Sequence, residues 1–212
     1  MKGITFGNFH SYDDFRLILK PKEIGSPEVK VRKIDIEGAD GSLDYTDFFG
    51  EPKYEDLTHK FEFSFKAPQS NLLYQYSQIK NAIHGKKMRI ILDDDPLYYY
   101  LGRVSVSSLA TERGIGLLSI ECDCEPWKYH LQETVSIINI DGTSTFDFHN
   151  EKKRVVPQIK TTAAMNISYG GNSWAVGVGS FTIPELELVE GYNYVTVTGT
   201  GTITFTYREA SL

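Results

Sequence analysis

The chain of 212 residues has only two cysteines, and it has no long apolar run. Cys122 and Cys124 are separated by one residue and provide no disulfide framework, so we expect the chain to fold in a reducing compartment. The first twenty residues lack the apolar core of a signal peptide, because Asp13 and Asp14 interrupt them. No segment approaches the length of a membrane-spanning helix, so we expect no membrane insertion.

Positive charge is also scarce. The sequence contains 22 Lys and Arg residues against 28 Asp and Glu residues, which gives a formal net charge of −6. The basic clusters, Lys86-Lys87 and Lys152-Lys153-Arg154, are short. Because nucleic-acid binding needs clustered basic side chains to neutralise phosphates, we do not expect nucleic acid to be the main partner and we expect no nucleic-acid specificity.

Motifs that would indicate catalysis or metal binding are missing. The run Asp93-Asp94-Asp95 lacks the spaced ligands and the glycine of a calcium loop, so a solvated turn is the better interpretation. The Cys122 and Cys124 pair has no second cysteine pair to complete a zinc site. Glu185 and Glu187 alternate with leucines, which is typical of the solvent face of a strand and not of a glycosidase pair. We therefore expect no enzyme activity, no catalytic residue, no metal and no cofactor.

Aromatic residues are abundant, with 13 Tyr and 12 Phe, and apolar periodicity predicts a mainly β chain with one helix. Alternation over residues 57–66 predicts a half-buried strand with its apolar side at Leu57, His59 and the following phenylalanines. Residues 70–84 are predicted to be the helix, with Ser70 as its N-cap and Gly85 just beyond its end.

The stretch from Val29 to Phe65 is predicted to be a long hairpin-like unit. Its first run, residues 29–36, changes side-chain phase, and a bulge near Lys33 would reconcile the two halves. Between the two runs lies an excursion that is acidic and aromatic. Disordered loops rarely contain so many aromatic residues, so we expect this excursion to pack on a neighbour or to be functional. The candidate subunit-interface residues here are Tyr45, Phe48, Phe49 and Tyr54.

Three consecutive tyrosines, residues 98–100, place rings on both faces of a predicted strand. Only one face of a small domain is core, so the outward ring is expected to be exposed or covered by another chain. We take Tyr99 to be that ring, which adds it to the candidate interface residues.

The composition changes from Thr161 onward, where Gly, Thr, Ser and Val dominate and short strands recur between turns. This predicts an all-β sandwich over residues 131–212, after a β-rich domain over residues 1–130. Hairpins are predicted around Gly170-Gly171 and around Gly199-Thr200-Gly201, and a turn at Asp141-Gly142. Trp174 and Tyr169 flank one of these turns and are candidates for glycan contact.

The order of several stretches resembles the distal tail protein (Dit) family of phages with long non-contractile tails that infect Gram-positive bacteria. The stretches are residues 3–11 (GITFGNFHS), 31–44 (VRKIDIEGADGSLD), 83–85 (IHG), 92–96 (LDDDP), 98–103 (YYYLGR), 124–129 (CEPWKY) and 191–201 (GYNYVTVTGTG).

This resemblance implies a baseplate hub: a hexameric ring formed by the N-terminal domains, with galectin-like C-terminal sandwiches. Such a ring joins the tail tube to a tail-associated, fibre-like or lysin-like, protein and often carries receptor-binding proteins. The protein would then be located in the virion, at the phage tail tip, after assembly in the host cytoplasm. The alternative is a carbohydrate-binding module that contacts host glycan through its C-terminal sandwich. A cell-wall glycoside hydrolase is the third hypothesis, and no acid/base pair in the sequence supports it.

Overall fold

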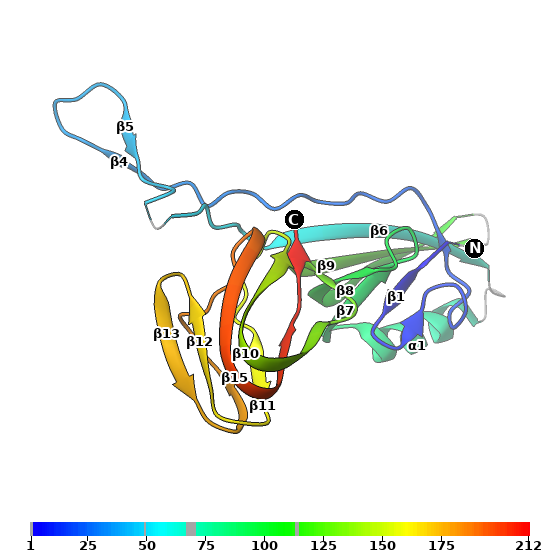
Figure 1. Cartoon of the computed structure of the whole chain (residues 1–212). Helices are drawn as coiled ribbons and strands as arrows, with labels where there is room; N and C mark the ends of the chain where they lie inside the picture. The colour runs from blue at the N-terminus through cyan, green and yellow to red at the C-terminus, as the bar shows by residue number, and fades with distance from the viewer. Residues whose placement is uncertain (1, 49, 67–70, 113–114) are drawn as a thin grey trace. The chain divides into compact units, whose positions relative to one another are not determined.

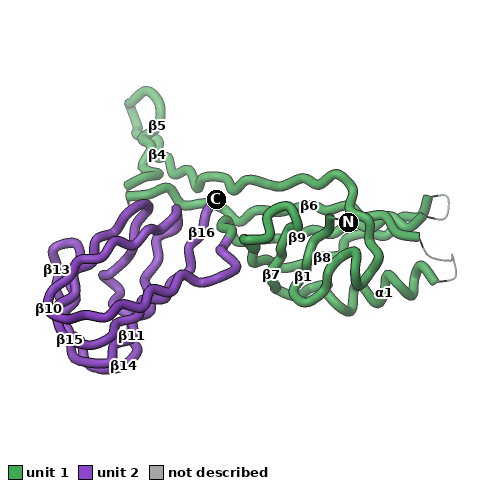
Figure 2. Tube along the Cα trace, turned by 45° about the vertical axis from the view of Figure 1, so that its right-hand side comes forward, with its two compact units in different colours: residues 1–128, 212 green, residues 129–211 purple. Residues whose placement is uncertain are grey.

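The computed structural model describes residues 2–48, 50–66, 71–112 and 115–212. The chain folds into two compact units, one made of residues 1–128 with Leu212 and the other of residues 129–211 (Figure 2). Strands dominate both units, and the helix α1 (Leu72–Ile83) belongs to the first. The mainly β class expected from the sequence is confirmed.

The first unit is built on one antiparallel sheet in the order β2-β1-β7-β8-β9-β6-β3 (Figure 1). Its strands are β1 (Ile4–Phe6), β2 (Phe9–His10), β3 (Ile18–Leu19), β6 (Leu57–Lys66), β7 (Lys87–Leu92), β8 (Tyr98–Glu112) and β9 (Ile115–His130). Strand β6 shows the predicted alternation: Leu57, His59, Phe61, Phe63 and Phe65 are buried, and the residues between them face away from the core.

Helix α1 packs on the core of this unit through one apolar stripe. Leu72, Ile79 and Ile83 are buried, and Tyr76 is partly buried against the same cluster, as the sequence predicts. Gly85 follows the helix with a φ of 76°, which is the conformation that favours glycine after a helix end. The N-cap predicted at Ser70 lies outside the described residues.

Strand β6 does not pair with the run that precedes it. One edge of β6 pairs with β9 from Leu57↔Cys124 to Lys66↔Ile115, and the other pairs with β3. None of the described pairs joins residues 29–36 to β6. Instead β4 (Lys33–Asp35) and β5 (Ser42–Asp44) form a separate two-stranded sheet. The long hairpin predicted from the sequence is therefore present, but its second strand is β5 and the segment up to Tyr54, not β6. With no buried face in β4, no bulge is required at Lys33.

We call residues 28–55 the arm. Its two legs are joined at the base by hydrogen bonds from Lys30 N to Lys53 O (2.7 Å) and from Glu55 N to Glu28 O (2.8 Å). Figure 1 shows the β4–β5 hairpin at the far end of these legs. The arm is therefore a defined structure, although it contributes little to the core.

Strand β9 is longer than predicted, because the sequence Glu125-Pro126-Trp127 does not end it. The ladder with β6 stops at Cys124, two residues before Pro126. Proline lacks a backbone donor, and it is tolerated where no such ladder bond is required. Beyond it, His130 N donates to Glu209 O at 3.0 Å, and β16 (Ala210–Ser211) pairs with β9.

The second unit contains one antiparallel sheet in the order β13-β12-β15-β11-β14, with β10 paired along the other side of β15. The strands are β10 (Thr134–Asn150), β11 (Gln158–Thr161), β12 (Met165–Tyr169), β13 (Asn172–Val176), β14 (Gly179–Thr182) and β15 (Gly191–Tyr207). The hairpin predicted around Gly170-Gly171 is confirmed as β12–β13, with both glycines at positive φ.

The predictions of turns at Asp141-Gly142 and at Gly199-Thr200-Gly201 are wrong. Strands β10 and β15 pair continuously over 17 residues, and Gly142 lies opposite Gly199 in the register. The glycines therefore mark a bend that both strands share. Gly199 and Gly201 adopt φ values of 156° and 140°. A Cβ on Gly199 would lie 2.9 Å from Met165 Cγ, so the bend also brings a neighbouring segment unusually close.

This bend folds the sheet upon itself. On the far side of β15, β12 pairs with residues 196–199 and β11 with residues 203–206. Side chains from the two halves meet in one core: the rings of Phe148 and Phe205, which lie in different halves, have centroids 4.7 Å apart. The galectin-like character expected of this domain stays a prediction.

Candidate functional site

The arm exposes apolar side chains that lie outside the core of the first unit. Residues 28–44 are all exposed, although they include four valine and isoleucine residues and Leu43. The exposed fractions are 50% for Ile34, 49% for Ile36, 54% for Leu43 and 78% for Phe48. A cluster of this kind on a well-formed hairpin is typical of an interaction surface.

The structure brings together only part of the candidate interface set. Phe48 and Tyr45 lie in the arm beyond β5, whereas Tyr54 lies at the base, where its ring meets Trp127 edge-on at 5.5 Å. Phe49 lies outside the described residues. Sequence reasoning missed Ile34, Ile36 and Leu43, because Ile34 and Ile36 fit an ordinary strand face and Leu43 lies between the glycine-rich turn and the aromatic excursion. Their isolation from any buried partner strand was not visible in the sequence.

The expectation that Tyr99 is an exposed ring is wrong. Tyr99 is only 7% exposed, and the Arg89 guanidinium lies over its ring at 4.8 Å from the centroid. The register Ile90↔Tyr100 places Tyr100 with the core-facing residues, so Tyr99 does point to the opposite face. It is covered there by a side chain of the same chain, as a long arginine permits.

A hollow of about 430 Å³ lies in the arm, lined by Leu43, Asp44, Tyr45, Asp47 and Phe48. Its wall is held by a hydrogen-bonded turn, in which Phe48 N donates to Tyr45 O (3.1 Å) and Gly50 N donates to Asp47 O (2.8 Å). The Thr46 backbone N–H donates to Asp44 Oδ1 at 2.9 Å. Hydrogen bonding by Thr46 lowers the pKa of Asp44, so this carboxylate is ionised at neutral pH.

The candidate glycan residues face the interior of the second unit. Trp174 pairs with the buried Ile167, and both Trp174 and Tyr169 pack against the core cluster. The Tyr169 hydroxyl donates to Asn193 Oδ1 (2.7 Å) or Glu187 O (3.0 Å), and burial raises its pKa. These contacts describe a structural tyrosine. A glycan-binding role for the pair stays a prediction.

The carboxylates of the three consecutive aspartates do not meet at one point. Asp93 accepts a hydrogen bond from Gly3 N (2.6 Å), Asp94 contacts Lys2 and Lys22, and Asp95 accepts from Lys128 Nζ (3.2 Å). Hydrogen bonds from the two lysines lower the pKa of Asp94 to about 2. Each carboxylate thus stabilises a different neighbour, and the described residues contain no group of three side chains suited to one metal ion.

The cysteines are buried opposite β6, where Cys122 faces His59 and Cys124 faces Leu57. Burial raises the pKa of both thiols, that of Cys124 to about 12, so neither is a thiolate at neutral pH. Burial lowers the pKa of His59 to about 4. Gly25 N donates to His59 Nδ1 at 3.2 Å, so the neutral ring accepts at that atom. These groups are structural.

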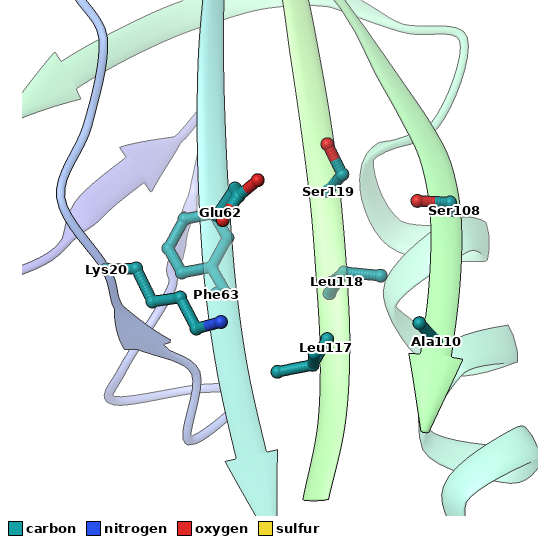
Figure 3. Close-up of a pocket in the computed structure, with 8 residues that line it drawn as sticks. All are labelled: Lys20, Glu62, Phe63, Ser108, Ala110, Leu117, Leu118 and Ser119. Carbon is teal, nitrogen blue, oxygen red and sulfur yellow. The ribbon is translucent and has the colours of Figure 1, made fainter. Parts of the chain in front are cut away.

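A second hollow, of about 190 Å³, lies on the sheet of the first unit (Figure 3). Lys20, Glu62, Ser108 and Ser119 supply its polar groups. No histidine or cysteine lines it, so its serines lack the adjacent base that would activate a hydroxyl. This arrangement gives no pair of nucleophile and base.

In the part of the chain that the structure describes, no helix has the length and apolar character needed to cross a membrane.

Comparison with solved structures identifies a full-length relative of this fold. The crystal structure of Dit (gp 19.1) from SPP1 matches with a TM-score of 0.75 over 100% of both chains, at 14% sequence identity. The chain has the fold of Dit. That Dit is described as a paradigm of the hub adsorption apparatus in phages that infect Gram-positive bacteria. No family model and no curated protein matches the sequence.

The fold expected from the resemblance to the Dit family is therefore confirmed. At 14% identity, the likeness to SPP1 Dit concerns the fold and does not carry residue roles across. The arm of the present chain consequently has to be interpreted from its own contacts and charges.

Proposed function

We propose that this protein is a structural hub of a phage tail tip. The observation that carries the proposal is the full-length match to SPP1 Dit, because both chains are covered completely. The exposed apolar arm supports it, since such a surface suits a protein whose work is assembly. The described residues present no catalytic constellation that would favour an enzyme instead.

In this proposal six copies form a closed ring through their first domains. The ring joins the tail tube to a tail-associated protein and carries receptor-binding proteins, within a virion assembled in the host cytoplasm. A closed ring needs heterologous contacts, in which one surface of each copy meets a different surface of the next. We assign the arm to one side of that contact, with Phe48, Tyr45 and Tyr54 among its residues.

The solution mass of the purified protein tests the ring. We expect light scattering to give a mass of about six chains and negative-stain images to show rings, because closed assembly is the physical content of the proposal. A monomer over the whole accessible concentration range, with and without the tail-tube protein, would contradict it.

Removal of the arm's distal part tests the role of that segment. Deleting residues 41–54 should leave the sheet of the first unit intact, because the described pairing partners of β6, which are β9, β3 and Glu23, all lie outside that range. We expect a folded monomer. A deletion variant that still forms rings rules out the arm as a ring contact, although the hub itself would remain.

No contact in the second unit favours carbohydrate binding by Trp174 and Tyr169, which are used internally. Binding on a glycan array that is lost in Trp174→Ala would favour the carbohydrate-binding module over the structural hub.

A further inference from the structure

The distal part of the arm has an unusual charge composition. Residues 34–51, which we call the arm tip, contain six acidic residues and no Lys, Arg or His. The chain has 28 acidic residues, so 22 remain outside the tip, which equals the number of Lys and Arg residues. The arm tip therefore carries the whole net charge of the protein. Its members are Asp35, Glu37, Asp40, Asp44, Asp47 and Glu51.

The hollow in the arm tip combines this charge with apolar walls. Leu43, Tyr45 and Phe48 supply the apolar surface, and Asp44 and Asp47 supply carboxylates. One oxygen of Asp44 accepts the Thr46 N–H, and Arg32 N donates to Thr46 Oγ1 at 2.9 Å, so the rim is held in place. Lysine and arginine have apolar stems and charged heads, and they match such a lining.

The first unit also has a positively charged surface. Lys86, Lys87, Arg89 and Arg103 are all exposed, and we call them the basic surface. They lie after the end of α1 and on β7 and β8, where Lys87 is directly opposite Arg103 in the register. Like charges in that position repel each other, unless anions lie close by.

Contacts within the chain compensate this surface only in part. Glu125 binds Lys87 at 2.7 Å. Arg103 donates to Gly85 O (2.6 Å), and Lys86 Nζ donates to Ala82 O (2.7 Å), and neither carbonyl bears a formal charge. Arg89 lies over Tyr99. Among the described contacts one carboxylate binds one of these four cations, so the surface stays positive and complements the arm tip.

We propose that the hollow in the arm tip receives a Lys or Arg side chain from the basic surface of a second copy of this chain. The inference rests on the proposed hub, and it specifies which two surfaces meet in the ring. Because the surfaces differ, the contact is heterologous and repeats head to tail, as ring closure requires.

Two charge-reversed variants test the contact. The tip variant is Asp44→Lys with Asp47→Lys, and the surface variant is Lys87→Glu with Arg103→Glu. In either variant alone, like charges meet at every contact, so we expect the assembly midpoint to move to a concentration more than about tenfold higher. Light scattering measures the mass, and circular dichroism verifies that each variant is folded. If the surface variant is unfolded, Lys86→Glu with Arg89→Glu replaces it.

An equimolar mixture of the two variants is the decisive sample. The lysine-bearing tip of one variant meets the glutamate-bearing surface of the other, and the remaining contact pairs the native tip with the native surface. We therefore expect assembly to return, with the two variants alternating, which an even-membered ring allows. Asp147→Lys with Glu185→Lys, both exposed in the second unit, is the matched control and should assemble like the wild type.

Salt gives a second readout. Raising the ionic strength from about 0.05 M to about 0.5 M should weaken wild-type assembly, because the screening length falls well below about 10 Å. Rings that survive both reversals, or a mixture that stays monomeric, would overturn the proposed contact while leaving the hub intact. In the first case the hollow serves a different basic protein or none. A wild-type protein that never assembles overturns the contact together with the ring.

Discussion

The arm and strand β6 are neighbours in the sequence and contain the same kinds of apolar residue, yet they have opposite fates. Phe61, Phe63 and Phe65 of β6 are buried, whereas Ile34, Ile36 and Leu43 of the arm are about half exposed. The difference lies in packing, because β6 is paired along the sheet and turns its apolar face into the core cluster, whereas the described strands of the arm, β4 and β5, pair with each other. The same kinds of residue thus stabilise the core in one segment and, in the proposed hub, supply a contact surface in the other.

Truncating one phenylalanine in each region gives the largest test of this comparison. Phe61 is fully buried between Phe6 and His59, so Phe61→Ala should lower the free energy of unfolding by about 3–5 kcal/mol. Phe48→Ala should change it by less than about 0.5 kcal/mol, because the ring is mostly exposed. Urea unfolding measures both. Similar losses in the two variants would mean that the arm is part of the core.

Low pH provides a test that affects the core of the first unit, which contains His59, and does not affect the apolar side chains of the arm. His59 has a pKa of about 4 when folded, below about 6.5 when unfolded, so protons bind the unfolded chain more readily. The contribution of the neutral His59 ring to the free energy of unfolding is therefore complete above pH about 6.5. It is lost as the pH falls toward about 4, and the loss amounts to about 3 kcal/mol. His59→Phe should flatten the pH dependence of urea unfolding in that window. An unchanged profile in the variant would show that other groups cause it.

The smallest expected effect concerns two glycines at positive φ. Gly201 lies in the bend of β15, where a Cβ would meet Ala163 Cβ and Thr162 Oγ1 at 3.0 Å. Gly41 lies in the arm with open space around it. Gly201→Ala should therefore cost about 1–3 kcal/mol in the free energy of unfolding. Gly41→Ala should leave global unfolding nearly unchanged, because the exposed arm contributes little to the core. Thermal unfolding compares them, and equal losses would remove the distinction.

Much of the first unit was predictable from local pattern. The alternation in residues 57–66 and the stripe in α1 are fixed by which faces must be apolar, and the structure confirms both. Predictions failed where the outcome depends on distant residues. Gly199-Thr200-Gly201 has the composition of a hairpin turn, but β10 pairs along the whole of β15 and makes it a bend. Tyr99 fits an outward ring, but Arg89 on β7 covers it.

The candidate interaction surface shows the same division. The sequence by itself determined that residues 44–56 are acidic and aromatic, and that no catalytic or metal motif accompanies them. Only the tertiary structure decided that Ile34, Ile36 and Leu43 belong to the same exposed surface, and that a hollow lies between Leu43 and Phe48. Composition and periodicity are properties of a segment. Exposure depends on whether another segment of the chain covers a face, and no described pair joins residues 29–36 to β6.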